Sequence, residues 1–308
     1  MAIGDTMTTI TMKPEHYPDA ALPIDAEFAQ LYVERVGEGA LLASKTRVAI
    51  VGLARNLGNL FSVTRQRVCD TADLFDLSTI IVVENDSTDG TDENVRSWAV
   101  DDPKRVIVQT TKTGRPQLRG FEPERMQAMA EYRARCQELV REHCPGVDYV
   151  IVLDMDAWGG WSNYGILNGI SWLKRLGAGC MASTSLFKHN GIQVSGVSQW
   201  CHYDQFAFRM YGYGMRMETW FPFWLPPVGS YPIDVFSAFG GLAIYQTAAY
   251  LQGEYSSPDG DCEHVHFHKS MSSKGWSIHL NPAQRCVMSW LADEEPSIDA
   301  HEHIDDQH

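Results

Sequence analysis

Residues 148–158, Asp-Tyr-Val-Ile-Val-Leu-Asp-Met-Asp-Ala-Trp, constrain the fold more than any other stretch of the chain. The run is rich in β-branched and apolar residues, which predicts a strand that is buried on both faces. It ends in Asp154 and Asp156. Because alternate side chains of an extended chain share a face, the two carboxylates can converge just beyond the strand. Such a pair favours Mg2+ or Mn2+, ions that complete their coordination with substrate phosphates.

The pattern alone leaves three interpretations of this strand end open. The first is a strand that ends in two solvated acids and has no further role. The second is the metal site of a glycosyltransferase that uses a nucleotide-sugar. The third is the nucleophile strand of a phosphatase of the haloacid-dehalogenase type, in which Asp154 would attack phosphate. The order of the remaining elements has to decide among them.

Buried strands and amphipathic helices alternate through the first half of the chain. Apolar runs predict strands at residues 47–56, 79–83 and 106–108, and helices are predicted between them. This alternation predicts an α/β fold, with a mostly parallel, Rossmann-like sheet and helices on both faces. Right-handed crossovers bring the carboxyl ends of such strands to one edge. We therefore expect the polar ends of the first, second and fourth strands to meet at one crevice.

The second half of the chain has a different character. Between residues 187 and 232 it is rich in Trp, Tyr and Phe, whose flat rings can stack on sugars, so we expect an aromatic-rich region that binds an acceptor. Filling a second core is the alternative role of each ring. The elements predicted around this region are helices at 163–176 and 259–274, a strand at 178–184, and a last strand at 276–280 that ends at Asn281-Pro282.

The composition is that of an ordinary soluble globular protein, with 44% hydrophobic and 21% charged residues. A formal net charge of -14 argues against nucleic acid as a partner. No apolar run approaches the roughly 20 residues that span a bilayer, so no transmembrane segment is expected. No secretory signal is recognisable at the N-terminus. Seven cysteines without Cys-x-x-Cys spacing fit reduced thiols, and we expect a cytoplasmic protein.

Three segments resemble glycosyltransferases. Residues 84–91, Glu-Asn-Asp-Ser-Thr-Asp-Gly-Thr, resemble the acidic turn of family-two-like glycosyltransferases with the GT-A fold. Residues 154–156, Asp-Met-Asp, and residues 262–264, Cys-Glu-His, follow in the order of that fold. The combination resembles more closely the fungal capsule-associated mannosyltransferases and their bacterial relatives. The likeness covers residues 47–285 and favours a glycosyltransferase over a phosphatase, but the Gln-x-x-Arg-Trp motif of processive enzymes is absent.

The resemblance implies a donor and an acceptor. The donor would be a nucleoside diphosphate-sugar, UDP- or GDP-linked, and the acceptor a carbohydrate or glycoconjugate. The residues implied in binding base and ribose are Gly52, Leu53, Arg55, Glu84 and Asp86. Carboxylates accept hydrogen bonds from ribose hydroxyls or from a base N–H. Turn formation is the alternative role of the two acids.

The resemblance also implies a metal site and a catalytic acid. Asp154 and Asp156 would bind Mn2+ or Mg2+, which would neutralise charge on the departing diphosphate. The residues implied around the ion are a third ligand from His264, His266 or His268, a phosphate contact from Arg133, and a catalytic acid, Glu263 or Asp261. This acid would remove the proton of the acceptor in an inverting reaction, or orient the acceptor in a retaining one.

We divide the chain into an N-terminal extension (1–44), one GT-A domain (45–292) and an acidic, flexible tail (293–308). Within the domain, residues 45–161 are expected to form the nucleotide-sugar half, and the remainder, from 162 to 292, the acceptor half. Two other functions stay open. One is a carbohydrate-binding protein that has this fold without catalysis, and the other is the phosphatase that uses Asp154.

Overall fold

The computed structural model describes most of the domain expected from the sequence. The residues it describes are 18–19, 22–118, 120, 122–194, 197–211 and 224–288, with no description of the side chains of residues 188–199. The predicted tail, the first 17 residues of the predicted extension and part of the aromatic-rich region, including Tyr213, Trp220, Phe221 and Phe223, lie outside these residues.

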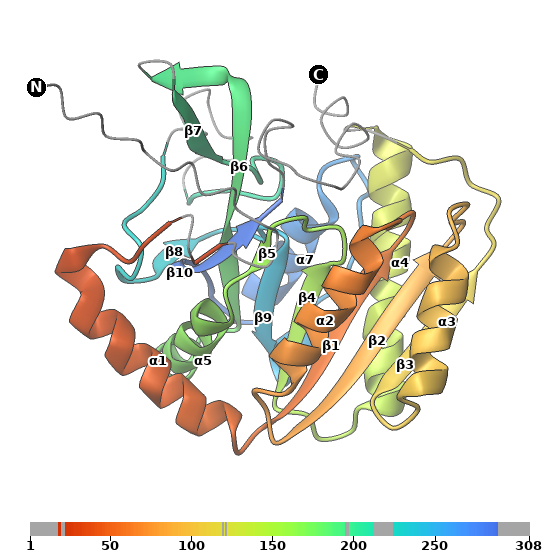
Figure 1. Ribbon diagram of the computed structural model, residues 1–308, viewed down its shortest axis with the longest axis horizontal. Helices are drawn as coiled ribbons and strands as arrows, with labels where there is room; N and C mark the ends of the chain where they lie inside the picture. The colour runs from red at the N-terminus through yellow and green to blue at the C-terminus, as the bar shows by residue number, and fades with distance from the viewer. Residues whose placement is uncertain are drawn as a thin grey trace, which may run out of the picture.

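Four strands of the first half form the parallel part of one large sheet (Figure 1). Strand β1 (Arg47–Ala54) lies between β2 (Leu77–Asn85) and β4 (Tyr149–Asp154), and β3 (Val106–Thr111) lies beside β2 at the edge. All three pairings are parallel, as the alternation of strands and helices predicts. The predicted α/β class, with helices on both faces of the sheet, is confirmed.

The second half of the chain completes the sheet with mixed pairings. Strand β9 (Leu242–Gln246) joins the halves, because it is antiparallel to β4 on one side and to β6 (Cys180–Val194) on the other. The remaining strands are β5 (Gly160–Trp161), β7 (Val197–His202), β8 (Ile233–Val235) and β10 (Ile278–Val287). The main order is β3-β2-β1-β4-β9-β6-β10-β5. Strands β6 and β7 form an antiparallel arm that projects from the sheet (Figure 1).

Helices cover both faces because each buried strand alternates its side chains between two cores. In β1, Val48 and Ile50 face one core, whereas Ala49 and Val51 face the other. The first core is covered by α2 (Leu60–Ala72), α3 (Thr91–Asp101) and α5 (Asn163–Leu176). The second is covered by α4 (Pro123–His143), α6 (Thr247–Gln252) and α7 (Glu263–Ser272).

Helix α1 (Ala29–Ala43), which follows a 3-10 turn at Ala26–Phe28, packs on α5. The two backbones approach closely at Gly39, where an added Cβ would overlap the carbonyl oxygen of Leu167. Polar contacts flank this crossing, because the Glu38 carboxylate accepts hydrogen bonds from Ser171 Oγ at 2.9 Å and from Arg175 Nε at 2.8 Å. The residues before β1 are therefore packed against the domain.

The last strand is longer than predicted. We expected it to end at Asn281-Pro282, but β10 continues to Val287. Its register against β6 shifts between Asn281 and Arg285, and Pro282 lies within this irregularity. A bulge tolerates proline because the position has no ladder hydrogen bond to donate. The continuation pairs with β5 through Cys286, so the end of β10 reaches the residues that follow Asp156.

No helix within the described part of the chain has the length and apolar character that crossing a membrane requires. The seven cysteines are all free thiols.

Candidate functional site

The polar ends of three strands meet at the carboxyl edge of the parallel half. In the register of the sheet, Leu53 of β1 lies opposite Asp154 of β4, and Ala54 lies opposite Glu84 of β2. The two acids therefore flank the end of β1. Beyond the strands, the backbone N–H of Asn56 donates to Ser87 Oγ at 3.1 Å, which joins the first two strand ends. The polar strand ends therefore lie next to one another, as the topology predicts.

The two aspartates at the start of the turn formed by residues 154–160 differ in their exposure to solvent. The Asp154 side chain is 26% exposed, whereas Asp156 is exposed to solvent. Helix α2 fixes the turn from one side: Thr64 Oγ1 donates to the Met155 carbonyl at 2.9 Å, and Arg67 Nη1 donates to the Trp158 carbonyl at 2.7 Å. Gly160 has a positive φ of 72°, a conformation that glycine adopts without the steric cost of a side chain, so the backbone can turn sharply there.

Asp154 is paired with a buried arginine. Arg133 Nη2 donates to Asp154 Oδ1, and the Arg133 side chain is only 2% exposed. Its guanidinium carbon lies 5.0 Å from the centre of the Phe239 ring. Burial raises the pKa of Asp154 to about 7, with Arg133 opposing the rise and Asp156 adding to it. Arg133 thus contacts a predicted metal ligand, and its predicted contact with phosphate is not tested.

Glu263 is the second carboxyl group near Arg133. Its Oε1 lies 3.9 Å from Arg133 Nε and 3.6 Å from His264 Nε2, and its side chain is 6% exposed. Burial raises the pKa of Glu263, and Arg133 lowers it by a smaller amount. The group begins α7, where the helix dipole favours an acid. A buried carboxyl with a raised pKa beside a crevice has the character of a proton acceptor.

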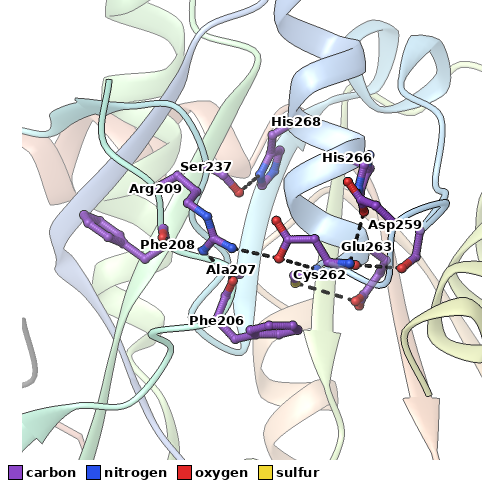
Figure 2. Close-up of polar contacts among 12 residues, drawn as sticks. Phe206, Ala207, Phe208, Arg209, Ser237, Asp259, Cys262, Glu263, His266 and His268 are labelled. Carbon is purple, nitrogen blue, oxygen red and sulfur yellow. Dashed lines mark hydrogen bonds and ion pairs between the residues drawn. The ribbon is translucent and has the colours of Figure 1, made fainter. Parts of the chain in front are cut away.

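The alternative catalytic acid, Asp261, is held in a different way. Its Oδ1 accepts hydrogen bonds from Arg209 Nη2 and from the Cys262 N–H, both at 2.8 Å. Arg209 is 3% exposed and also donates to the carbonyls of Phe206 and Phe208. Figure 2 shows Arg209 beside the start of α7, next to Cys262 and Glu263. Asp261 therefore anchors the beginning of α7.

The three candidate histidines lie in three environments. His268 is fully buried between Ser237 Oγ at 2.9 Å and Tyr245 OH at 3.0 Å, and His266 contacts Asp259 at 2.7 Å (Figure 2). His264 is buried and stacks on Phe239, and neither of its ring nitrogens has a hydrogen-bond partner. Burial lowers the pKa of His264, so the imidazole is neutral, as a metal ligand must be. Of the three, only His264 lies beside Glu263 with unpaired nitrogens.

The predicted nucleoside-binding residues are mostly engaged within the protein. Gly52 makes room for Met155, because an added Cβ would lie 2.6 Å from Met155 Cε. Leu53 is partly buried against the second core, which α4, α6 and α7 cover. Arg55 Nη2 donates to the Arg115 carbonyl at 3.1 Å. The assignment of these three residues to nucleotide binding stays a prediction.

The two acids at the end of β2 also form turns. Glu84 is fully buried and accepts from the Ser87 N–H at 2.9 Å, which leaves Oε2 without a partner. Asp86 accepts hydrogen bonds from the N–H groups of Thr113 and Gly114 and from Thr113 Oγ1. Burial alone raises the pKa of Asp86, but these hydrogen bonds outweigh it and lower the pKa to about 2. Their assignment to nucleotide binding likewise stays a prediction.

A cleft of about 300 Å³ lies beside these strand ends, between β2, β3 and α4. It is lined by residues that the sequence interpretation did not select, among them Asn85, Thr113 and Tyr132. Asn85 Nδ2 donates to Tyr132 OH at 3.3 Å, and the Arg115 guanidinium lies 5.8 Å from the Tyr132 ring. Asn85 lies between Glu84 and Asp86, the two acids that the resemblance implies in nucleoside binding. Its position in that motif was therefore the one sequence signal that could have identified it.

Two further residues near the aspartates were missed as a pair. Asp204 Oδ2 accepts from the Gly240 N–H at 2.7 Å, Asp204 Oδ1 accepts from the Ala207 N–H at 3.0 Å, and burial raises its pKa. The pKa of the Tyr203 hydroxyl is raised first by burial and then by the negative charges of Asp156 and Asp154. Tyr203 stood in the aromatic-rich region, but no local pattern marked Asp204.

Two carboxylates at the end of β4 are the oxygen donors of the predicted metal site. Among the described residues, no group of three or more His, Cys, Asp or Glu side chains is assembled as a metal site. Asp156 is exposed and makes no hydrogen bond within these residues, and Asp154 keeps one carboxylate oxygen that does not contact Arg133. Hard oxygen ligands of this kind suit Mg2+ or Mn2+, which usually bind through one or two carboxylates together with substrate phosphates and water.

Comparison with known proteins gives matches only among solved structures. No protein-family model and no curated protein sequence matches the chain. A mannosyltransferase from Pyrobaculum calidifontis, in complex with GDP-Man and Mn2+, matches at 16% identity and a TM-score of 0.45, over 89% of this chain and 69% of its own. GalNAc-T7 with UDP, GalNAc and Mn2+ matches at 12% identity and a TM-score of 0.47, over 89% and 54%.

TarS from S. aureus, residues 1–349, matches at 12% identity and a TM-score of 0.44, over 79% of this chain and 60% of its own. All three matches have TM-scores below 0.5 and sequence identities of 16% or less. At this similarity the matches assign no activity, sugar or metal to this chain.

Proposed function

We propose that the protein is a metal-dependent glycosyltransferase that moves a sugar from a UDP- or GDP-linked donor to a hydroxyl group of a carbohydrate or glycoconjugate. The observation that carries this proposal is the arrangement at the end of β4. An exposed Asp156 and a partly exposed Asp154 lie at the carboxyl edge of the parallel strands, and a buried Glu263 lies on the other side of Arg133. Ligands of open α/β sheets bind at this edge.

The two aspartates would hold Mn2+ or Mg2+, with His264 as the candidate third ligand. The bound ion would act as a Lewis acid toward the diphosphate leaving group. Arg133 would keep Asp154 oriented, because its guanidinium is fixed by burial and by the Phe239 ring. This role replaces a direct phosphate contact in our proposal, since Arg133 is 2% exposed.

Glu263 is our candidate for the catalytic acid, in preference to Asp261. Its carboxyl group is buried, has a raised pKa and lies 3.9 Å from Arg133 Nε, while the Cys262 thiol donates to its Oε2 at 3.6 Å. Asp261 is instead neutralised by Arg209. In an inverting reaction Glu263 would take the proton of the acceptor hydroxyl as that oxygen attacks the sugar. In a retaining reaction it would orient the acceptor.

The nucleoside would lie along the ends of β1 and β2 and reach the 300 Å³ cleft beside Asn85. The cleft offers hydroxyl groups from Thr111 and Thr113, and an aromatic ring from Tyr132. Such groups hydrogen-bond and stack with bases without a requirement for charge. Within the cleft, Asn85 Nδ2 donates to Tyr132 OH at 3.3 Å, and a bound base would compete for this weak hydrogen bond.

Replacement of the two aspartates tests the proposal. Nucleoside diphosphate release from UDP- and GDP-sugars, with Mn2+ present, should fall about a hundredfold or more in Asp156→Asn and in Asp154→Asn, because a lost Lewis acid costs several kcal/mol in barrier. Asp76→Asn is the matched control, since Asp76 is exposed just before β2 begins, at the opposite end of that strand. Undiminished release in both site variants would contradict the metal site.

The same assay separates the other two functions. A carbohydrate-binding protein without catalysis would bind sugars and release no nucleoside diphosphate from any donor. A phosphatase would hydrolyse phosphate esters without a nucleotide and would form an acyl-phosphate on Asp154, which mass spectrometry of the trapped protein would detect.

A further inference from the structure

A second cleft lies away from the strand ends, between α2 and β5, and we refer to it as the α2–β5 cleft. Its volume is about 450 Å³, within the range of about 300–1,000 Å³ that small-molecule sites occupy. The polar and aromatic side chains that line it are those of Asp19, Gln66, Arg67, Asp70, Trp161 and Asn163. They come from three segments that are far apart in the sequence, so the cleft is a product of the fold.

The walls of the cleft are fixed by hydrogen bonds behind them. Thr71 Oγ1 accepts from Trp161 Nε1 at 2.8 Å and donates to Asn163 Oδ1 at 2.7 Å. Asp19 Oδ1 accepts from Ser162 Oγ at 2.7 Å and from Arg285 Nη2 at 2.6 Å. These contacts hold the indole, the amide and the carboxylate in place before any ligand arrives, which lowers the entropic cost of binding.

Several polar atoms of the lining keep hydrogen-bonding capacity. Gln66 Nε2 donates to Asp70 Oδ1 at 2.7 Å, which leaves Asp70 Oδ2 and the Gln66 carbonyl oxygen available. The Asn163 amide nitrogen and Asp19 Oδ2 likewise make no hydrogen bond within the described residues. The cleft thus presents carboxylate acceptors together with amide donors and acceptors, beside the mostly buried Trp161 ring.

This set of groups selects the charge of the ligand. The lining contains two carboxylates and a single guanidinium, and Arg67 already donates to the carbonyls of Ala157 and Trp158, so an anion is disfavoured. A cation gains little from Asp19, because that carboxylate is neutralised by Arg285, and little from Asp70, because that carboxylate is exposed to solvent. A purely apolar ligand would leave the amides and carboxylates unpaired. A neutral molecule with several hydroxyl groups satisfies all of them.

We propose that the α2–β5 cleft is a carbohydrate-binding site, separate from the crevice at the strand ends and from the aromatic-rich region. The cleft and the Asp154–Gly160 turn share Arg67, which lines the cleft and donates to two carbonyls of the turn. Gly160 is required beside it, since an added Cβ would lie 2.6 Å from Arg67 Nε. A glycan in the cleft would therefore rest against the residue that holds the turn.

Saturation-transfer NMR in the presence of EDTA and without nucleotide tests this site alone. The neutral probes are methyl α-D-mannopyranoside, methyl β-D-galactopyranoside and cellobiose, and the charged probes are methyl phosphate and choline. The double variant Gln66→Ala/Asp70→Ala removes exposed side chains of the cleft wall. The matched control is Gln30→Ala/Glu34→Ala, which removes an exposed pair with the same spacing and the same hydrogen bond, at 2.8 Å, from α1.

We expect at least one neutral saccharide to bind, with a dissociation constant at least fivefold higher in the cleft variant and unchanged in the α1 variant. Three results would overturn the site: no saturation transfer to any saccharide, equal binding by both variants, or binding of methyl phosphate or choline in place of the saccharides. Because metal and nucleotide are absent, none of these outcomes depends on the proposed transferase activity.

Discussion

At the scale of single residues, the environment separates acids that look equivalent in the sequence. Asp261 and Glu263 are two positions apart, and either was a candidate for the catalytic acid. Asp261 lies against the buried Arg209, whereas Glu263 is itself buried, 3.9 Å from Arg133. The first carboxylate has a close cationic partner and a structural task, and the second retains the raised pKa that proton transfer needs.

Glu263→Gln should reduce turnover by about 10²–10⁴-fold, the usual contribution of a general base, and leave the fold intact. In the wild type, burial raises the pKa of Glu263 above 4.5, so the rate should fall as the pH drops through a value above the ordinary glutamate range. The Gln variant should lack this acidic limb. Asp261→Asn serves as the comparison, and a greater loss in that variant, with the limb retained in Glu263→Gln, would contradict our assignment.

Asp86 gives a prediction about stability. The pKa of its carboxyl group is about 2 in the folded protein, whereas the ordinary value of an aspartate is 3.8. A carboxyl group with a lowered folded pKa stabilises the fold above its ordinary pKa, and this contribution is lost as the pH falls toward the folded value. Asp86→Asn should therefore lower the free energy of unfolding at pH 7 by about 1 kcal/mol, a value reduced for partial exposure.

Urea unfolding of Asp86→Asn and the wild type at pH 7, 4 and 3 checks this sign. The difference between the two proteins should be constant from pH 7 to about pH 5 and should narrow below pH 4. A difference that widens as the pH falls would mean that the hydrogen bonds from Thr113 and Gly114 do not favour the ionised carboxylate.

At the scale of secondary-structure elements, the local sequence pattern predicts where a helix or strand lies in the chain, but it does not predict which other element it packs against. The helix at residues 163–176 was predicted with the bounds that α5 has, because its apolar period is local. Its contact with α1 depends on Gly39, and nothing in the sequence near Gly39 indicates a partner more than 100 residues away. Similarly, β10 continues past Pro282 because β5 and β6 offer partners there, and such pairing is not written in the local sequence.

Alanine substitutions at two glycines of α1 test two effects separately: close helix packing at Gly39 and helix propensity at Gly37. Gly39→Ala should lower the free energy of unfolding by about 1–3 kcal/mol, because the new Cβ must displace the backbone of α5. Gly37 is exposed with no atom near its absent Cβ, so Gly37→Ala should raise stability by about 0.5–1 kcal/mol. Chemical denaturation measures both, and equal effects of the two substitutions would show that α1 is not docked at Gly39.

At the scale of the whole molecule, the sheet topology explains which parts of the site the sequence could predict. Asp154, Asp156 and Glu84 lie at strand ends of the parallel half, where strand order alone brings them together. Asp204 and Tyr203 follow β7, in the half where antiparallel pairings dominate, and their approach to Asp154 depends on how that half folds back. The Arg133–Asp154 pair was missed for a related reason, because a helix face does not reveal which strand end lies beneath it.

A ligand that bridges the halves of the site should stabilise the whole molecule. In a thermal-shift panel of UDP, GDP, CMP and ADP, we expect UDP or GDP to raise the melting temperature only when Mn2+ is present. At a hundredfold excess over its dissociation constant the ligand contributes about 2.7 kcal/mol, which corresponds to about 5 °C or more. Asp156→Asn should abolish the Mn2+-dependent part of the shift, and Asp76→Asn should preserve it. A nucleotide shift that is the same in EDTA as in Mn2+ would show that nucleotide binding does not involve a metal held by the aspartates, because a shared ion makes the two affinities depend on each other.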